Sequence, residues 1–261
     1  MKTGLKYLIF ITMSLLFAGL LVISGEMARK ERAKKTCSGL VVEIADSSKL
    51  HFVTAKDVRN YIKEDYGTFS GKRLDSVGLR KIEESLVRHS AILSAQAWTV
   101  TDGKVHVSVT QREPVARFMT TEGGFYSDEK GYLFPLQNHY TSRVPIIDGN
   151  VPLSLSRCKN GIPVSEKERK WLEGVIELIS YIGNDKVWKD AIVQISVDSD
   201  GDLVMVPRKG RELFIFGTPQ DYEEKFARIK DYYSAVAPSA AADSIKYRYV
   251  TVKYRGQIIC R

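Results

Sequence analysis

The stretch "AQAWTVTDGKVHVSVTQR", residues 95–112, decides the fold of the first half of the chain. It contains two runs of alternating apolar and polar residues, joined through Asp102 and Gly103. An Asp-Gly pair between two such runs is a strong local signal for a β-hairpin. We therefore predict two antiparallel strands over these residues.

Three further elements precede this hairpin. The run "GLVVEI" (39–44) has the β-branched residues and alternation of a strand. Thr54 and Asp57 form a capping-box signal at the start of a helix, and an apolar stripe indicates a second helix near 75–89. The order β-α-α-β-β predicts a module in which two helices pack on a three-stranded sheet.

The remainder of the chain is predicted to be mostly β-structure. Alternating runs around turn residues indicate hairpins, and capped apolar stripes indicate helices. The expected elements are hairpins over 123–136 and 191–206, a strand at 211–217, helices over 165–182 and from Thr218 to about 236, and a final strand.

The segment "TQREPVARF" (110–118) joins the two parts. Arg112, Glu113 and Arg117 flank Pro114, which forces an extended residue before it and interrupts a strand ladder. We interpret the segment as an interdomain link rather than a recognition surface. The pattern leaves the role of its charged residues open.

Composition excludes several functional classes. The chain has 261 residues, a formal net charge of +8 and 44% hydrophobic residues, which is typical of folded domains. Its four histidines and three cysteines lack the spacing of metal ligands, and the spacing does not decide whether two of Cys37, Cys158 and Cys260 form a disulfide. No phosphate-binding loop, nucleophile elbow or carboxylate pair is present. We therefore expect no enzyme activity, no catalytic residue, no metal and no cofactor. Dispersed basic residues argue against a nucleic-acid partner.

The N-terminal stretch "YLIFITMSLLFAGLLVISG" (7–25) carries no charge. As a helix it would extend ~28 Å, about the thickness of a hydrocarbon core. Its length favours a retained transmembrane helix over a cleaved signal peptide, whose apolar core is usually shorter. The basic residues on both sides of it do not settle its orientation.

The chain ends on "IKYRYVTVKYRGQIICR", residues 245–261, which alternates like a strand and is rich in Tyr and basic residues. At a sheet edge, such a strand would accept a partner strand by β-augmentation. In the centre of a sheet it would be part of the core. The pattern permits both positions.

Several segments in this order resemble the bacterial FtsQ/DivIB family: the β-α-α-β-β module, "TQREPVARF", "YSDEKGYLFPL", "VPIIDGN" and "YVTVKYRG". The resemblance implies an α+β fold with a single N-terminal transmembrane helix, a POTRA domain and an elongated, mostly antiparallel β domain with flanking helices. The implied boundaries are a cytoplasmic tail at 1–6, the membrane helix at 7–25, a juxtamembrane linker at 26–38, the POTRA domain at 39–112 and the β domain at 113–261.

The resemblance also implies a function. Members of this family are non-enzymatic division proteins of the inner membrane, with a cytoplasmic N-terminus and a periplasmic or extracytoplasmic bulk, enriched at the division septum. They connect early division proteins with the FtsB–FtsL pair and help to control septal peptidoglycan synthesis. The membrane helix and the POTRA domain would contact the lipid bilayer and other divisome members. A secreted or periplasmic POTRA-containing assembly or chaperone factor, and a secreted hydrolase with a cleaved signal, are the alternatives.

By position, the family's partner-binding edge corresponds to the last strand, with Tyr254 as the aromatic anchor. The residues to which this role is carried over are Tyr249, Val250, Thr251, Val252, Lys253, Tyr254, Arg255 and Gly256, with Phe226, Arg228 and Ile229 of the preceding helix.

Overall fold

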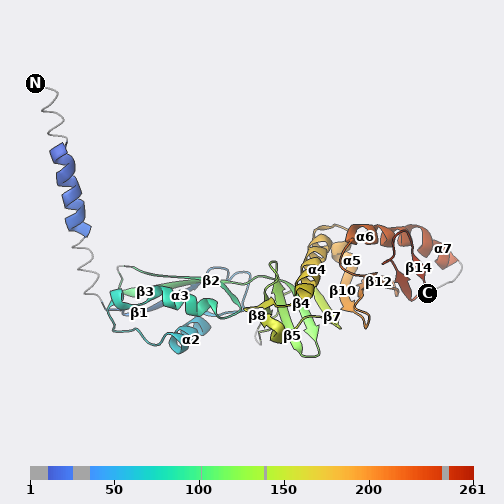
Figure 1. The fold of residues 1–261 in the computed structure, drawn as a ribbon, viewed down its shortest axis with the longest axis horizontal. Helices are drawn as coiled ribbons and strands as arrows, with labels where there is room; N and C mark the ends of the chain where they lie inside the picture. Colours follow the sequence, from blue (N-terminus) through green and yellow to red (C-terminus); the bar gives the residue numbers. More distant parts are fainter. Residues whose placement is uncertain (1–10, 26–35, 101, 138–139, 243–246) are drawn as a thin grey trace, which may run out of the picture. The chain divides into compact units, whose positions relative to one another are not determined.

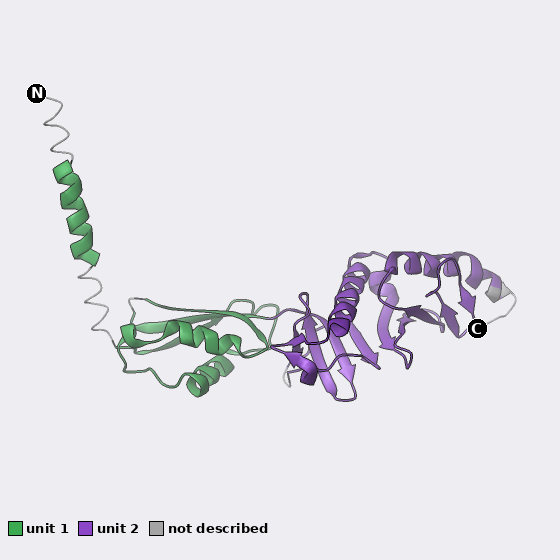
Figure 2. Ribbon diagram, in the orientation of Figure 1, with its two compact units in different colours: residues 1–111 green, residues 112–261 purple. Residues whose placement is uncertain are grey.

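The structure is a computed structural model that describes residues 11–25, 36–100, 102–137, 140–242 and 247–261 (Figure 1). The chain divides into two compact units, residues 1–111 and 112–261 (Figure 2). The predicted cytoplasmic tail at 1–6 and residues 26–35 of the predicted linker lie outside the described residues.

Residues 11–25 form a helix, which is the described part of the predicted membrane segment. Residues 7–10 of that segment lie outside the described residues. Within the described ranges, no helix combines the length and the apolar character needed to cross a membrane.

The rest of the first unit has the predicted two-layer arrangement. Strand β3 lies at the centre of the sheet, parallel to β1 and antiparallel to β2, so the hairpin predicted at 95–112 is confirmed. Thr54 and Asp57 exchange the two hydrogen bonds of a capping box, which is also as predicted. The elements are β1 (Gly39–Ile44), α2 (Ala55–Asp65), the short 3-10 helix η1 (Leu74–Ser76), α3 (Leu79–Val87), β2 (Ile92–Thr99) and β3 (Lys104–Gln111).

The second unit is built on one nine-stranded sheet. Its strand order is β14-β13-β12-β11-β10-β7-β4-β5-β6, and β8 and β9 form a separate two-stranded ribbon. Its strands are β4 (Pro114–Thr120), β5 (Gly123–Asp128), β6 (Leu133–Pro135), β7 (Ile146–Gly149), β8 (Cys158–Lys159), β9 (Ile162–Pro163), β10 (Ile192–Val197), β11 (Leu203–Pro207), β12 (Leu213–Gly217), β13 (Tyr249–Thr251) and β14 (Ile259–Cys260). Its helices are η2 (Leu155–Arg157), α4 (Glu166–Asn184), α5 (Trp188–Ala191), α6 (Tyr222–Asp231), the π-helix η3 (Tyr232–Val236) and α7 (Ala237–Ala242).

This sheet is mixed: five of its eight neighbouring pairs are antiparallel, in line with the expectation of a mostly antiparallel domain. Three neighbouring pairs are parallel: β4 with β7, β7 with β10, and β12 with β13. A parallel pair needs a crossover connection, and α4 with α5 and α6 with α7 supply two of these crossovers. The helices pack on one face of the sheet, where Phe226 lies in the core beside Trp188 and Phe216 (Figure 1).

The three cysteines have free thiols. Burial raises the pKa of the Cys158 and Cys260 thiols, which keeps both protonated near neutral pH.

A buried ion pair fixes the start of the second unit. The Arg112 guanidinium contacts the Asp128 carboxylate and stacks 3.6 Å from the centre of the Tyr132 ring. Asp128 also accepts hydrogen bonds from the backbone N–H groups of Lys130 and Tyr132, each at 2.9 Å. Both charged side chains are at most 9% exposed. Arg112 therefore has a structural role in the hairpin of β5 and β6.

We predict that Asp128→Asn lowers the free energy of unfolding by about 3–5 kcal/mol, because it removes the carboxylate opposite a buried guanidinium. Urea denaturation followed by tryptophan fluorescence measures this change. The matched control is Asp75→Asn, whose partner Arg73 is 61% exposed and whose loss is expected to cost less than about 1 kcal/mol. Equal effects of the two variants would contradict the prediction.

Candidate partner-binding site

The C-terminal strand is shorter than expected and is not the edge of the sheet. β13 covers only Tyr249–Thr251 and lies between β12 and β14. Tyr249 and Arg261 exchange two backbone hydrogen bonds, of 2.9 and 3.1 Å. The chain turns after Thr251, and Gly256 adopts a φ of 66° in this turn. The predicted edge strand over 249–256 is therefore wrong: the last residues of the chain cover β13, and β14 forms the edge.

Residues 252–256 form a turn that hydrogen bonds tie to neighbouring elements. We call it the Tyr254 loop. The Val252 N–H donates to the Ile215 carbonyl at 3.0 Å. The Val252 carbonyl accepts from Arg228 Nε of α6 at 2.9 Å. Both backbone groups of Val252 are thus bonded to neighbouring elements, and the side chain is fully buried. The start of the loop is held by the sheet on one side and by a helix on the other.

Two ion pairs hold the next residues of the loop. Lys253 contacts the Asp202 carboxylate, and this hydrogen bond raises the pKa of Lys253. Arg255 lies 3.3 Å from Asp221, in a pair that is mostly exposed and hence weak. Between them, Tyr254 is 49% exposed, with Lys253 Nζ 5.3 Å from its ring centre. The loop presents a half-exposed aromatic side chain between Lys253 and Arg255, each of which is paired with a carboxylate.

Gly217 permits the loop to approach the sheet. It lies at the end of β12 with a φ of 81°, and a Cβ there would come within 2.7 Å of Lys253 Cβ. A side chain at this position would therefore strain the backbone and push the loop outward.

The remaining predicted site residues fall into three groups. Phe226 and Ile229 belong to the core, which corrects the expectation that they line a binding groove. Val250 is also buried, on the core side of β13. Tyr249 and Thr251 project from the opposite side of β13 and are at least partly exposed.

Sequence reasoning misplaced the helix next to the loop. α6 begins at Tyr222 rather than at Thr218. The buried Lys225 Nζ donates to the backbone carbonyls of Thr218 and Gln220, at 2.8 and 2.6 Å, and so holds these residues in a turn. Asp221, at the N-cap, has a φ of 53°. Its left-handed backbone and its ion pair with the loop had no signal in the sequence.

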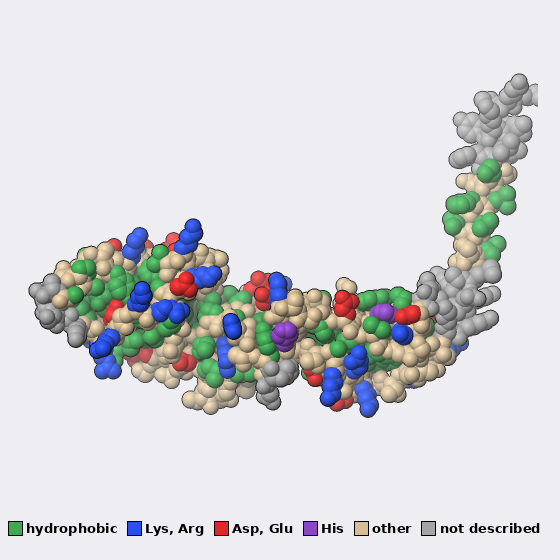
Figure 3. Space-filling view, turned by 180° about the vertical axis from the view of Figure 1, so that it is seen from behind, with side chains coloured by type: hydrophobic (Ala, Val, Ile, Leu, Met, Phe, Trp, Pro, Cys, Tyr) green, Lys and Arg blue, Asp and Glu red, His purple; other side chains and the backbone are tan. Residues whose placement is uncertain are grey.

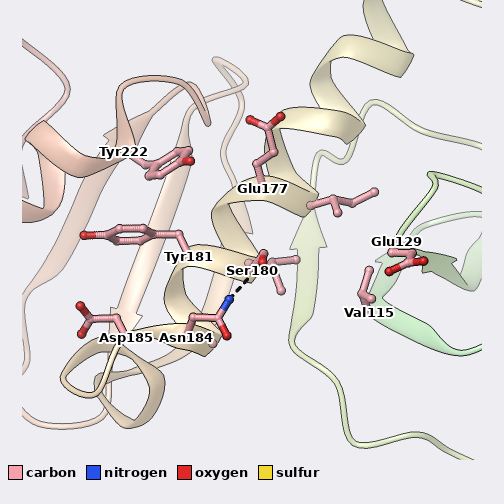
Figure 4. A pocket seen from close by; sticks show the side chains of 11 residues that line it. Val115, Glu129, Glu177, Ser180, Tyr181, Asn184, Asp185 and Tyr222 are labelled. Atoms are coloured by element: carbon pink, nitrogen blue, oxygen red, sulfur yellow. Dashed lines mark hydrogen bonds between the residues drawn. The ribbon is translucent and has the colours of Figure 1, made fainter.

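A second surface feature lies along α4 (Figure 4). It is a hollow of about 910 Å³ with Tyr181 and Tyr222 on one side, their ring centres 5.0 Å apart. The residues that line it include Glu129, Glu177 and Asp185 and no Lys or Arg. Burial and the carboxylate of Asp185 raise the pKa of Tyr181. The hollow offers acceptors to a cationic group, in contrast to the basic Tyr254 loop.

No metal centre accompanies these features in the described ranges, where no cluster of three or more His, Cys, Asp and Glu side chains is suited to hold an ion. On the face drawn in Figure 3, Lys and Arg side chains lie beside hydrophobic ones on the second unit.

The fold defines a two-domain α+β protein, and the comparisons match a family model to each domain. Residues 35–110 match the model of the POTRA-like domain. Residues 113–261 match the family model "FtsQ/DivIB, C-terminal related". The chain belongs to the FtsQ/DivIB family, a family of cell-division proteins, which confirms the resemblance. A search of the curated proteins gave no match.

We predict that Gly217→Ala displaces the Tyr254 loop, whereas Gly256→Ala does not. Gly256 also has a positive φ, but no atom lies within 4 Å of the position that a Cβ would take there. Its substitution should cost about 1–2 kcal/mol from backbone strain alone. Gly217→Ala should cost more, because the new methyl group also meets Lys253.

Urea denaturation measures the two costs, and amide chemical shifts of residues 252–256 report the displacement. Gly217→Ala should shift these amides strongly, while Gly256→Ala should change only its immediate neighbours. Equal costs and equal shifts in the two variants would show that the close approach of Lys253 is unimportant.

Proposed function

We propose that the protein is a non-enzymatic, membrane-anchored scaffold of the division machinery. In this role it connects early division proteins with an FtsB–FtsL-type pair and helps to control septal peptidoglycan synthesis. The observation that carries the proposal is the Tyr254 loop, which holds a half-exposed tyrosine between Lys253 and Arg255 in the domain that matches the family.

The partner is expected to bind at this end of the sheet. Exposed tyrosines held in one conformation are frequent binding hot spots, because little side-chain entropy is lost on binding. Lys253 and Arg255 would favour an acidic partner segment that competes with Asp202 and Asp221 for them, and salt should weaken the complex. β14 provides the unpaired backbone beside the loop, so the partner's main chain would pair there rather than along 249–256.

Membrane anchoring through residues 7–25 supports a position at the septum. The described helix at 11–25 exposes apolar side chains around its surface, including Leu15, Leu16, Phe17 and Leu20. A helix that is apolar all round needs an apolar environment. The proposed orientation rests on the family match instead: the N-terminus would lie in the cytoplasm and the two units in the periplasm or its equivalent, with the POTRA domain and the membrane segment contacting other divisome members.

Our alternative is a POTRA-containing assembly or chaperone factor. Depletion of the protein in cells separates the two functions. A division scaffold leads to filamentous cells and gives a fluorescent fusion that forms bands at mid-cell, whereas an assembly factor leads to defects in secreted or outer-membrane proteins without filamentation.

We predict that Tyr254→Ala weakens binding to a purified FtsB–FtsL pair by roughly 30-fold or more, the loss typical of a hot-spot side chain. Tyr254→Phe keeps the ring and should bind within about threefold of the natural protein. Calorimetric titration measures both affinities, and thermal unfolding checks that both variants fold. Full binding by folded Tyr254→Ala would remove Tyr254 as the anchor.

We predict that the full-length protein stays with the membrane fraction after carbonate extraction and retains its N-terminal residues. The double substitution Leu16→Arg and Leu20→Arg should release the protein from the membrane fraction, since each Arg at the centre of a membrane helix costs about 2.5–3.5 kcal/mol. Arg at Leu93, an exposed residue of β2, is the matched control and should leave membrane association unchanged. Mature protein that begins after residue 25 would instead support a cleaved signal.

A further inference from the structure

The side of β11–β14 that faces away from the helices is apolar. One row of cross-strand neighbours runs through four strands: Val204, Ile215, Thr251 and Ile259. Beside it, Leu213 is the neighbour of Tyr249. We call this surface the outer face, made up of Val204, Val206, Leu213, Ile215, Tyr249, Thr251 and Ile259.

These side chains do not belong to the core. Along each strand they alternate with buried residues such as Met205, Phe214 and Val250. None of them packs against the core cluster, and each is at least partly exposed. A sheet with one face in water normally carries polar residues on that face. An apolar face of this kind indicates a surface that binds another molecule.

The same side of the sheet is covered elsewhere by the chain itself. At β5 and β6, Tyr126 and Phe134 are neighbours on the side opposite the core residues Phe125 and Leu133, and both are fully buried. The Ser142 N–H donates to the Tyr126 hydroxyl at 3.1 Å, so a segment of the chain lies over this part. Among the described residues, no helix or strand covers β11–β14 on this side (Figure 1).

Cations gather at one end of the outer face. β11 ends and β12 begins at this end, and the parallel β13 and the antiparallel β14 bring their own flanking residues to it. These residues are exposed, and within the described part of the chain none of them forms an ion pair with a carboxylate side chain: Arg208, Lys209, Arg211, Arg248 and Arg261. Glu212 is the acidic residue beside them.

We propose that the outer face is a second docking surface, which binds an acidic amphipathic segment of a partner protein. The apolar side chains of that segment would cover the rows of Val204 and Leu213. Its carboxylates would lie at the cationic end, where they complement the charge. A second copy of this chain docked outer face to outer face would place the same cations against these and would offer them no acidic complement. This surface lies on the face of the strands, whereas the Tyr254 loop follows the end of β13 and the proposed strand pairing uses the backbone of β14, so the two sites adjoin but use different groups.

The test uses two synthetic helical peptides with the same leucine face, one with Glu at one end and one with Lys at the same positions. Fluorescence polarisation with the full-length protein should show at least tenfold tighter binding of the Glu peptide, weakened by added NaCl. Ile215→Lys should reduce this binding at least tenfold. Val164→Lys, at a valine that is 64% exposed and outside the outer face, should leave it unchanged, as should Tyr254→Ala.

Equal binding of the two peptides, or binding that Ile215→Lys does not change, would overturn the proposal. A dimer in sedimentation equilibrium that Ile215→Lys dissociates would also overturn it, because the occupant would then be a second copy. Either result leaves the proposed scaffold role at the Tyr254 loop unaffected, since Tyr254→Ala is tested against a different ligand.

Discussion

The arrangement of the C-terminal surface depends on how the chain ends β13. The strand ends after three residues, and β14 pairs with its outer edge. The next residue, Val252, is hydrogen-bonded through its N–H to the Ile215 carbonyl and through its carbonyl to the Arg228 side chain. A continuous strand over 249–256 would place Tyr254 within the ladder. The turn instead places Tyr254 on a loop that is hydrogen-bonded to its neighbours, with about half of the tyrosine's surface exposed. The conformation of this loop, rather than an open strand edge, is what the proposed partner would recognise.

Charge separates the surfaces of the second unit. The Tyr254 loop and one end of the outer face carry cations, while the hollow along α4 is lined by carboxylates and tyrosines. In the proposed scaffold, opposite charges on different faces of one domain would direct different classes of partner segment to different faces. The net charge of +8 for the whole chain does not reveal this division.

Local signals allowed much of the fold to be predicted from the sequence. The hairpin at 95–112 and the capping box of Thr54 and Asp57 depend on residues close in the chain, and both are present. Long-range pairing was harder to predict. The parallel pairs of the large sheet and the return of β14 onto β13 join segments whose register no local pattern specifies.

The candidate site was predicted only in part, for the same reason. Tyr254 stands between two basic residues in the sequence, but the conformation of its loop depends on Asp202, Asp221 and Gly217, which lie in other parts of the chain. Phe226 and Ile229 are apolar residues of an amphipathic helix, and the helical pattern alone cannot tell a core face from a binding face.

Hydrogen exchange of the protein, with and without a bound FtsB–FtsL pair, tests the central claim most directly. We expect the partner to slow exchange in residues 252–261, which include the Tyr254 loop and β14, with little change in the first unit's β1–β3 sheet. Protection confined to the first unit, or absent from residues 252–261, would contradict the account.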